Sequence, residues 1–190
     1  AFNITIRKPS FTPGTTFELS YGNYGFIQAK SSVTGALTKK IAGRLSFSGT
    51  QRDGLLENVS TGTSVNDLNN QGVRGQLLYK PTENIGITLA ADYTKQRPNG
   101  YAQVIAGVAP TLRDGYRQFN NIIADLGYKL PSNNPFDRKI DTDTSWKSYQ
   151  DLGGASLNLE AKNGNGTLTS TSAYRFWDWE PSNDRDFTGL

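Results

Sequence analysis

The sequence predicts an all-β fold, and more narrowly a segment of an antiparallel transmembrane β-barrel. Three observations lead to this prediction. Apolar and polar residues alternate along a series of short segments, bulky charges recur on the polar side, and aromatic residues gather near one end of the segments. Short and long links alternate along most of the chain. This alternation is typical of a barrel with tight turns on one side of a membrane and extended loops on the other.

The predicted strands follow from period-two alternation, which gives each of them one apolar and one polar face. A first strand-like stretch covers residues 1–6. Seven barrel strands follow, at residues 15–23, 26–35, 41–52, 72–79, 85–94, 154–161 and 167–179. Transmembrane β-strands need about 9–11 residues, and these segments come close to that length.

The links predict which ends of the strands carry loops. Gly, Asn and Pro give hairpin chemistry to three short links, at residues 35–40, 80–84 and 162–166. Two longer excursions, at about residues 53–70 and 97–145, are predicted as extracellular loops, so the short links become periplasmic turns. The tight link at residues 21–25 is an exception, because it falls on the long-loop side.

The second long loop contains one segment with helical periodicity. Apolar residues within 116–130 recur close to helical spacing, which predicts a short amphipathic helix ending near Gly127 and Pro131. The alternative is an apolar patch that packs the loop onto its neighbours. The DTDT stretch at residues 141–144 lacks the spacing and Gly of a calcium loop, so we predict a polar turn there and no metal site.

Five bulky charged residues stand in mid-strand on the polar faces: Glu18, Lys30, Arg44, Arg74 and Asp92. A wet or plugged barrel lumen permits such charges. We expect them to contact the plug or one another, because unpaired burial of a charge is costly. Alternation alone fits a soluble β-sandwich equally well, and that alternative stays open.

Aromatic residues predict a girdle at the long-loop ends of the strands, where Tyr and Trp sit well at the level of lipid headgroups. The candidates are Tyr21, Tyr93, Tyr149, Tyr174 and Phe176. In the last strand Arg175 is expected to point into the lumen. Trp177 and Trp179 have the opposite parity from Tyr174, so either a bulge turns them or they line a vestibule above the membrane.

Composition narrows the function classes. The 190 residues include no His and no Cys, which removes the commonest general base, the commonest metal ligand and any disulfide. Nothing pairs a nucleophile with a base, so we expect no enzyme, no cofactor and no catalytic residue. The net charge of +3 comes without basic runs, so nucleic acid is not an expected partner. The mean hydropathy of −0.55 is compatible with a membrane barrel, which exposes only alternate residues to lipid.

Several stretches resemble TonB-dependent outer-membrane receptors. AFNITIRKPS is similar to the last strand of the family's plug domain, and FELSYGNYG with VTGALTKKIAGRLSFSGTQRDG resembles the first barrel strands. NDLNNQGVRGQLLYKPTENIGITLAADYT continues the likeness through the next hairpin, and GTLTSTSAYRFWDWEPSNDRDFTGL resembles a later strand and loop. The resemblance is nearest to the siderophore-receptor-like branch.

The resemblance implies that residues 1–10 are the last plug strand and residues 11–190 the N-terminal portion of a larger barrel. Such barrels have about 22 strands. The implied location is the bacterial outer membrane, with membrane lipid as the surroundings. The implied partners are the TonB–ExbB–ExbD complex, reached through regions outside this chain, and possible contact with a surface lipoprotein.

The resemblance also implies energy-coupled uptake of a scarce nutrient such as a ferric siderophore, captured by extracellular loops. Cations and aromatics of the second loop suit an anionic, aromatic chelate through charge-assisted bonds and stacking. The ligand-binding candidates are Arg97, Tyr101, Arg113, Tyr116 and Arg117. Two other functions stay open: a small self-contained barrel serving as an anchor or adhesin, and a soluble carbohydrate-binding β-sandwich.

Overall fold

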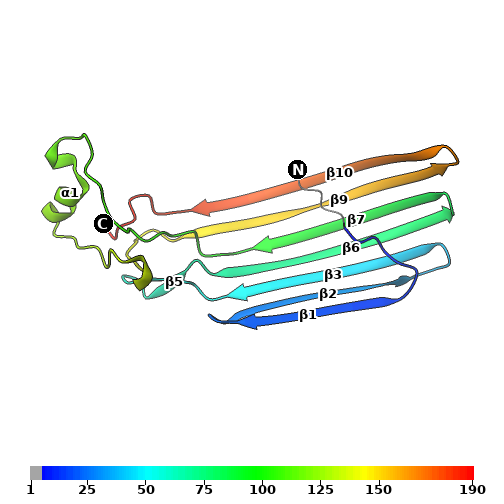
Figure 1. The fold of residues 1–190 in the computed structure, drawn as a ribbon, viewed down its shortest axis with the longest axis horizontal. Helices are drawn as coiled ribbons and strands as arrows, with labels where there is room; N and C mark the ends of the chain where they lie inside the picture. Colours follow the sequence, from blue (N-terminus) through cyan, green and yellow to red (C-terminus); the bar gives the residue numbers. More distant parts are fainter. Residues whose placement is uncertain (1–5) are drawn as a thin grey trace. The chain divides into compact units, whose positions relative to one another are not determined.

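A seven-stranded antiparallel sheet dominates the computed structural model, which describes residues 6–190 (Figure 1). The strand order is β1-β2-β3-β6-β7-β9-β10, so β1 and β10 are its edges and the described strands form an open sheet. The bounds are β1 Gly14–Gly22, β2 Phe26–Ala36, β3 Ile41–Arg52, β6 Leu68–Thr82, β7 Ile85–Gln96, β9 Lys147–Asn163 and β10 Gly166–Ser182. The fold is therefore mostly antiparallel β, in agreement with the predicted all-β class.

Each of the seven predicted barrel strands is present in this sheet, and three of them are longer than predicted by four or more residues. β6 has 15 residues, and β9 and β10 have 17 each. The added residues at the start of β9 are mostly polar and do not alternate clearly. They become strand because β7 supplies hydrogen-bonding partners as far as Gln96, which faces Gln150. Pairing therefore extends strands beyond their sequence pattern.

Strand register places the predicted apolar residues on one face. Leu19 lies opposite Ala29, and Val33 lies opposite Leu45. Across the sheet, Leu77 pairs with Leu89, which pairs in turn with Leu157. Paired residues of an antiparallel sheet share a face. We call this side the apolar face and the opposite side, which carries Glu18 and Asp92, the polar face.

Tight turns join strands at one end of the sheet, as predicted: β2 to β3, β6 to β7, and β9 to β10 (Figure 1). The opposite end carries both long connections and the predicted exception, the link between β1 and β2. There Tyr24 and Gly25 have φ values of 60° and 61°, and the Phe26 amide donates to the Asn23 carbonyl oxygen. Positive φ at both central positions matches the twist of a tight hairpin.

Residues 6–13, which precede β1, cross the polar face (Figure 1). Lys8 forms an ion pair with Glu160 of β9, the Ser10 amide donates to Thr34 Oγ1 of β2 at 2.9 Å, and Pro9 is buried. Of the strand predicted over residues 1–10, residues 1–5 lie outside the described part of the chain. Residues 6–10 have no regular secondary structure.

The long connections form a second compact unit, made of residues 52–68, 97–149 and 180–190. The first unit contains the body of the seven-stranded sheet. The second unit has a small sheet of order β5-β4-β8, with β4 at Leu56–Asn58, β5 at Thr63–Val65 and β8 at Lys139–Ile140. Its core consists of Val65, Ala102, Ile140 and Trp146. The excursions predicted only as loops thus have a packed interior of their own.

The predicted helix is present but short. Helix α1 covers Phe119–Asp125, follows the 3-10 turn η1 at Gly115–Arg117, and ends before Gly127, which has a φ of +67°. A second 3-10 turn, η2, covers Pro135–Asp137. No residue of α1 is fully buried, but Phe119 and Ile123 are half-buried, so part of its apolar side packs as the alternative prediction required. No helix in residues 6–190 is long and apolar enough to cross a membrane.

Candidate functional site

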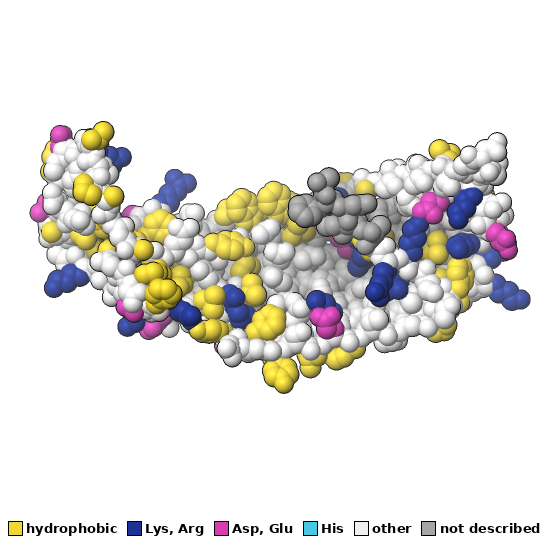
Figure 2. Space-filling model, viewed as in Figure 1, with side chains coloured by type: hydrophobic (Ala, Val, Ile, Leu, Met, Phe, Trp, Pro, Cys, Tyr) yellow, Lys and Arg dark blue, Asp and Glu magenta, His cyan; other side chains and the backbone are white. Residues whose placement is uncertain are grey.

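The polar face of the sheet carries charged side chains of both signs, several of them paired (Figure 2). Lys30 Nζ lies 3.0 Å from Glu18 Oε1, and both side chains are about half exposed. Arg44 donates to Ser32 Oγ at 3.1 Å. These charges therefore contact neighbours across the strands, which is one of the two arrangements predicted for them.

Asp92 on β7 is the centre of a larger charge cluster. Arg74 of β6 approaches Asp92 Oδ1 at 2.8 Å, and Arg175 of β10 approaches Asp92 Oδ2 at 2.7 Å. The Asp92 side chain is only 17% exposed. Its carboxylate thus joins three strands through two charge-assisted hydrogen bonds, and Arg175 lies on the polar face as predicted.

Two adjacent glycines of β9 make room for side chains that cross this strand. A Cβ on Gly154 would lie 3.0 Å from Arg175 Cδ and 2.1 Å from the Tyr174 carbonyl oxygen. A Cβ on Gly153 would lie 2.7 Å from the Phe176 ring. The absence of side chains at these positions lets Arg175 pass over one face of β9 and Phe176 over the other.

Aromatic residues predicted as a girdle lie on the apolar face near the long-loop ends of β1, β7 and β10. Tyr21 is 86% exposed and Tyr174 is 71% exposed. Tyr93 and Phe176 have ring centroids 6.4 Å apart. Tyr149, which belongs to the second unit, differs from the others because two cations lie over its ring. Arg97 is 5.4 Å and Lys147 5.8 Å from the ring centre.

Trp177 and Trp179 form an aromatic platform that was not among the predicted ligand residues. Their rings stack with centroids 5.7 Å apart at an interplanar angle of 12°, and the Trp177 indole N–H donates to Gln150 Oε1 at 3.2 Å. Both keep the parity of Arg175, so they belong to the polar face. Their odd-numbered positions, shared with Arg175, were the sequence signal that could have placed them on the polar face. The stacked, exposed arrangement of the rings is seen only in the structure.

The predicted ligand residues of the second loop fall into two local groups. Arg97 stacks on Tyr149, and Tyr101, four residues later, is 67% exposed. The other three surround η1: Arg113, Tyr116 and Arg117. Gln118 fixes this turn, because its amide nitrogen donates to the Arg113 and Thr111 carbonyl oxygens. The Tyr116 side chain is 72% exposed, so it can meet a ligand from solution.

The DTDT stretch is more than the polar turn predicted for it. Thr142 is 1% exposed, and its hydroxyl oxygen accepts hydrogen bonds from the Trp146 indole N–H at 2.9 Å and from Asn58 Nδ2 at 3.0 Å. These bonds satisfy polar groups inside the core of the second unit. In residues 6–190, no group of three or more carboxylates is arranged to hold a metal ion.

Three ionisable groups in the second unit have shifted pKa values. Burial, followed by the hydrogen bond to Asp141, raises the pKa of Tyr128 to about 12. Burial and a hydrogen bond with Asp186 raise the pKa of Asp184. Burial also acts to raise the pKa of Asp186, but hydrogen bonds from Asp184 and Thr188 outweigh it and the pKa is lowered. When the pH falls, the pair therefore takes up its first proton on Asp184.

This pair predicts a pH dependence. Because the pKa of Asp184 is raised on folding, the folded state binds its proton more tightly, and the stabilisation from this residue is lost as the pH rises through the folded pKa. Asp184→Asn, which mimics the protonated acid, should remove that loss. Carboxyl carbon NMR titration should show Asp184 titrating at higher pH than Asp186. The reverse order would contradict the assignment.

Comparisons with known proteins add no relative. A scan against protein-family models, a search of curated proteins and a search of solved structures each gave no match to this chain.

Proposed function

We propose that this chain is a segment of a TonB-dependent outer-membrane receptor, in which it supplies the last segment of the plug and the first seven strands of a larger barrel. The receptor would bind a scarce nutrient, such as a ferric siderophore, and import it unchanged with energy from the TonB–ExbB–ExbD complex. An open sheet needs further strands, because β1 and β10 leave rows of unpaired backbone groups.

The observation that carries the proposal is the exposure of the apolar face. Large apolar side chains on every strand are between about two-fifths and seven-eighths exposed: Phe17, Leu19, Tyr21, Ile27, Val33, Leu45, Phe47, Val73, Leu77, Leu89, Tyr93, Leu157, Leu168 and Tyr174. A patch of this extent is far larger than those that soluble monomers expose. Lipid is a solvent that stabilises such a surface, and strands of 9–17 residues are long enough to cross it.

The opposite face supports a hydrated lumen. Glu18 pairs with Lys30, and Asp92 pairs with Arg74 and Arg175. The segment at residues 6–10 lies across this face, held by Lys8 and Ser10. A plug segment is expected to lie in this position when it leads into the first barrel strand. A soluble β-sandwich would instead bury the apolar face under a second sheet.

Single cysteines can test the assignment of the faces, since the chain has no native Cys. Spin labels at Leu19→Cys and Leu157→Cys, in the complete receptor reconstituted in liposomes, should collide mainly with oxygen dissolved in the bilayer. Labels at the neighbouring Ser20→Cys and Asn158→Cys should collide mainly with a water-soluble nickel chelate. Leucine-site labels shielded from both reagents would indicate a sandwich and contradict the proposal.

Transport is tested separately from membrane insertion. Cells that produce the complete receptor should accumulate radioactive iron from a ferric catecholate or a ferric hydroxamate only when TonB is present. A receptor that inserts but whose iron uptake is unaffected by TonB would point to another barrel function, including the anchor or adhesin.

Cations around η1 are expected to contribute to ligand affinity. Removing the charge at Arg113 and Arg117 together should weaken binding of an anionic ferric catecholate at least about tenfold, because a hydrogen bond to a charged group contributes roughly 1.5–3 kcal/mol. Arg185→Gln is a matched control, since Arg185 is also an exposed loop arginine. Equal affinity of the double variant and this control, measured on purified receptor, would refute the prediction.

A further inference from the structure

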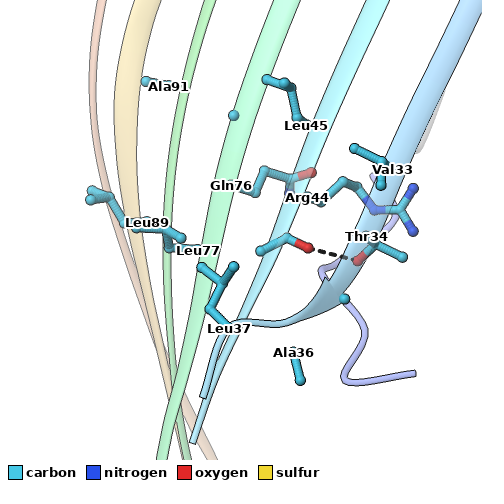
Figure 3. Close-up of a pocket in the computed structure, with 13 residues that line it drawn as sticks. Val33, Thr34, Ala36, Leu37, Arg44, Leu45, Gln76, Leu77, Leu89 and Ala91 are labelled. Carbon is cyan, nitrogen blue, oxygen red and sulfur yellow. Dashed lines mark hydrogen bonds between the residues drawn. The ribbon is translucent and has the colours of Figure 1, made fainter. Parts of the chain in front are cut away.

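A groove marks the apolar face close to the tight turn between β2 and β3 (Figure 3). Its volume is 570 Å³, and β2, β3, β6 and β7 all contribute to its lining. Leucine side chains surround it: Leu37, Leu45, Leu77 and Leu89. Gly75 lies in its floor, where an added Cβ would have no atom within 4 Å.

The form of the groove suits a linear apolar molecule. Its lining runs from Val33 in β2 to Leu37 at the start of the following turn, about 13 Å at a rise of 3.3 Å per residue. The groove lies among side chains that we expect to face lipid. Its neighbours in the membrane are then fatty acyl chains. Because an acyl chain is as apolar as leucine, preference for this groove must come from close packing and from the headgroup.

Positive charge gathers where the groove ends. Lys39 and Lys40 follow Leu37 in the turn, and the Lys80 amide donates to the Lys40 carbonyl oxygen at 2.8 Å. The same three lysines line a second hollow, of about 340 Å³, together with Phe11 and Glu83, and Lys80 Nζ lies 6.0 Å from the centre of the Phe11 ring. Within three residues of the three tight turns the sequence has four lysines, these and Lys162, and one carboxylate, Glu83.

We propose that this end of the sheet binds an anionic phospholipid, with one acyl chain in the groove and its phosphate beside Lys39 and Lys40. The inference rests on the proposed membrane location of the apolar face. Each lysine near an anionic lipid surface increases the association constant about fivefold. Glu83, which lines the same hollow as the three lysines, offsets part of this attraction and leaves a net positive charge.

The test measures which phospholipid stays bound to the complete receptor. Receptor reconstituted with equal amounts of phosphatidylglycerol and phosphatidylcholine is extracted in mild detergent, and the retained lipid is counted by native mass spectrometry. The wild-type receptor should retain phosphatidylglycerol at least about fivefold over phosphatidylcholine. Substituting Gln at Lys39, Lys40 and Lys80 should abolish this preference, whereas Lys162→Gln, outside both hollows, should preserve most of it.

Filling the groove provides an independent variant. Gly75→Leu should occupy the acyl-chain position and lower retention of both lipids at least about threefold, because the open space at Gly75 accepts the added atoms. Ala155→Leu adds the same kind of side chain on the same face outside the groove and should behave like the wild type. Equal retention of the two lipids by wild-type receptor, or equal retention by the two leucine variants, would overturn the inference.

These outcomes separate the inference from the proposed function. A receptor that inserts into liposomes but retains lipid without preference refutes only the phospholipid site. A protein whose leucine-site spin labels show no contact with the bilayer refutes both.

Discussion

Gly154→Ala is expected to cost about 3 kcal/mol of unfolding free energy, among the largest effects of a single methyl group in this sheet. The added Cβ would lie 2.1 Å from the Tyr174 carbonyl oxygen and 3.1 Å from Arg175 Cα. Both are backbone atoms, which cannot rotate away. β10 must therefore move off β9, and the path of Arg175 to Asp92 is lost with it.

Denaturant titration of the complete receptor in liposomes, followed by tryptophan fluorescence, measures this cost. Gly75→Ala is the matched control, since it is also a glycine in a long strand of the same sheet but has no atom within 4 Å of its added Cβ. We expect this control to change stability by less than about 1 kcal/mol, or to stabilise slightly by restricting the unfolded chain. Equal stability of the two variants would show that β9 and β10 do not approach as closely as described.

Asp92→Ala is expected to have the second large effect, a loss of about 3 kcal/mol of unfolding free energy. The substitution leaves Arg74, whose side chain is 27% exposed, without its carboxylate partner. An uncompensated cation in a partly buried site is costly. Arg175, which is 53% exposed, can turn to water and contributes less to the loss.

Two further variants separate charge from packing at Asp92. Glu18→Gln removes one carboxylate from a half-exposed pair on the same face and should cost less than about 1 kcal/mol. Replacing both Arg74 with Met and Asp92 with Leu should recover most of the stability lost in Asp92→Ala, because no buried charge is then left unpaired. If the single and double replacements are equally unstable, the cost comes from packing and not from the ion pair.

Much of the sheet could be predicted from alternation. Each of the seven predicted segments became a strand, since a period of two places Leu19 and Tyr21 on one face and Glu18 and Ser20 on the other, whatever the neighbouring strands are. Strand ends were harder to predict. The polar start of β9 has no clear pattern and is a strand because β7 pairs with it.

The candidate sites divide in the same way. Mid-strand charges identified the polar face, and the direction of Arg175 followed from its parity. The partners of those charges did not follow, because the strand order and register decide that Arg74, Asp92 and Arg175 meet. Helical spacing located α1, but its length depends on Gly127, where the backbone adopts a positive φ.

The sequence by itself determined the strands, their two faces and the ends that carry tight turns, because these depend on the local alternation of side chains and on turn residues. Only the tertiary structure decided the open seven-stranded order and the ion-pair partners of Asp92. It also decided the stacked pair of Trp177 and Trp179, the packed interior of the long connections and the groove over Gly75. Apart from the tryptophan pair, whose Trp177 is held by Gln150 of the neighbouring strand, each of these joins residues far apart in the chain. The distance between such residues is set by strand pairing and packing.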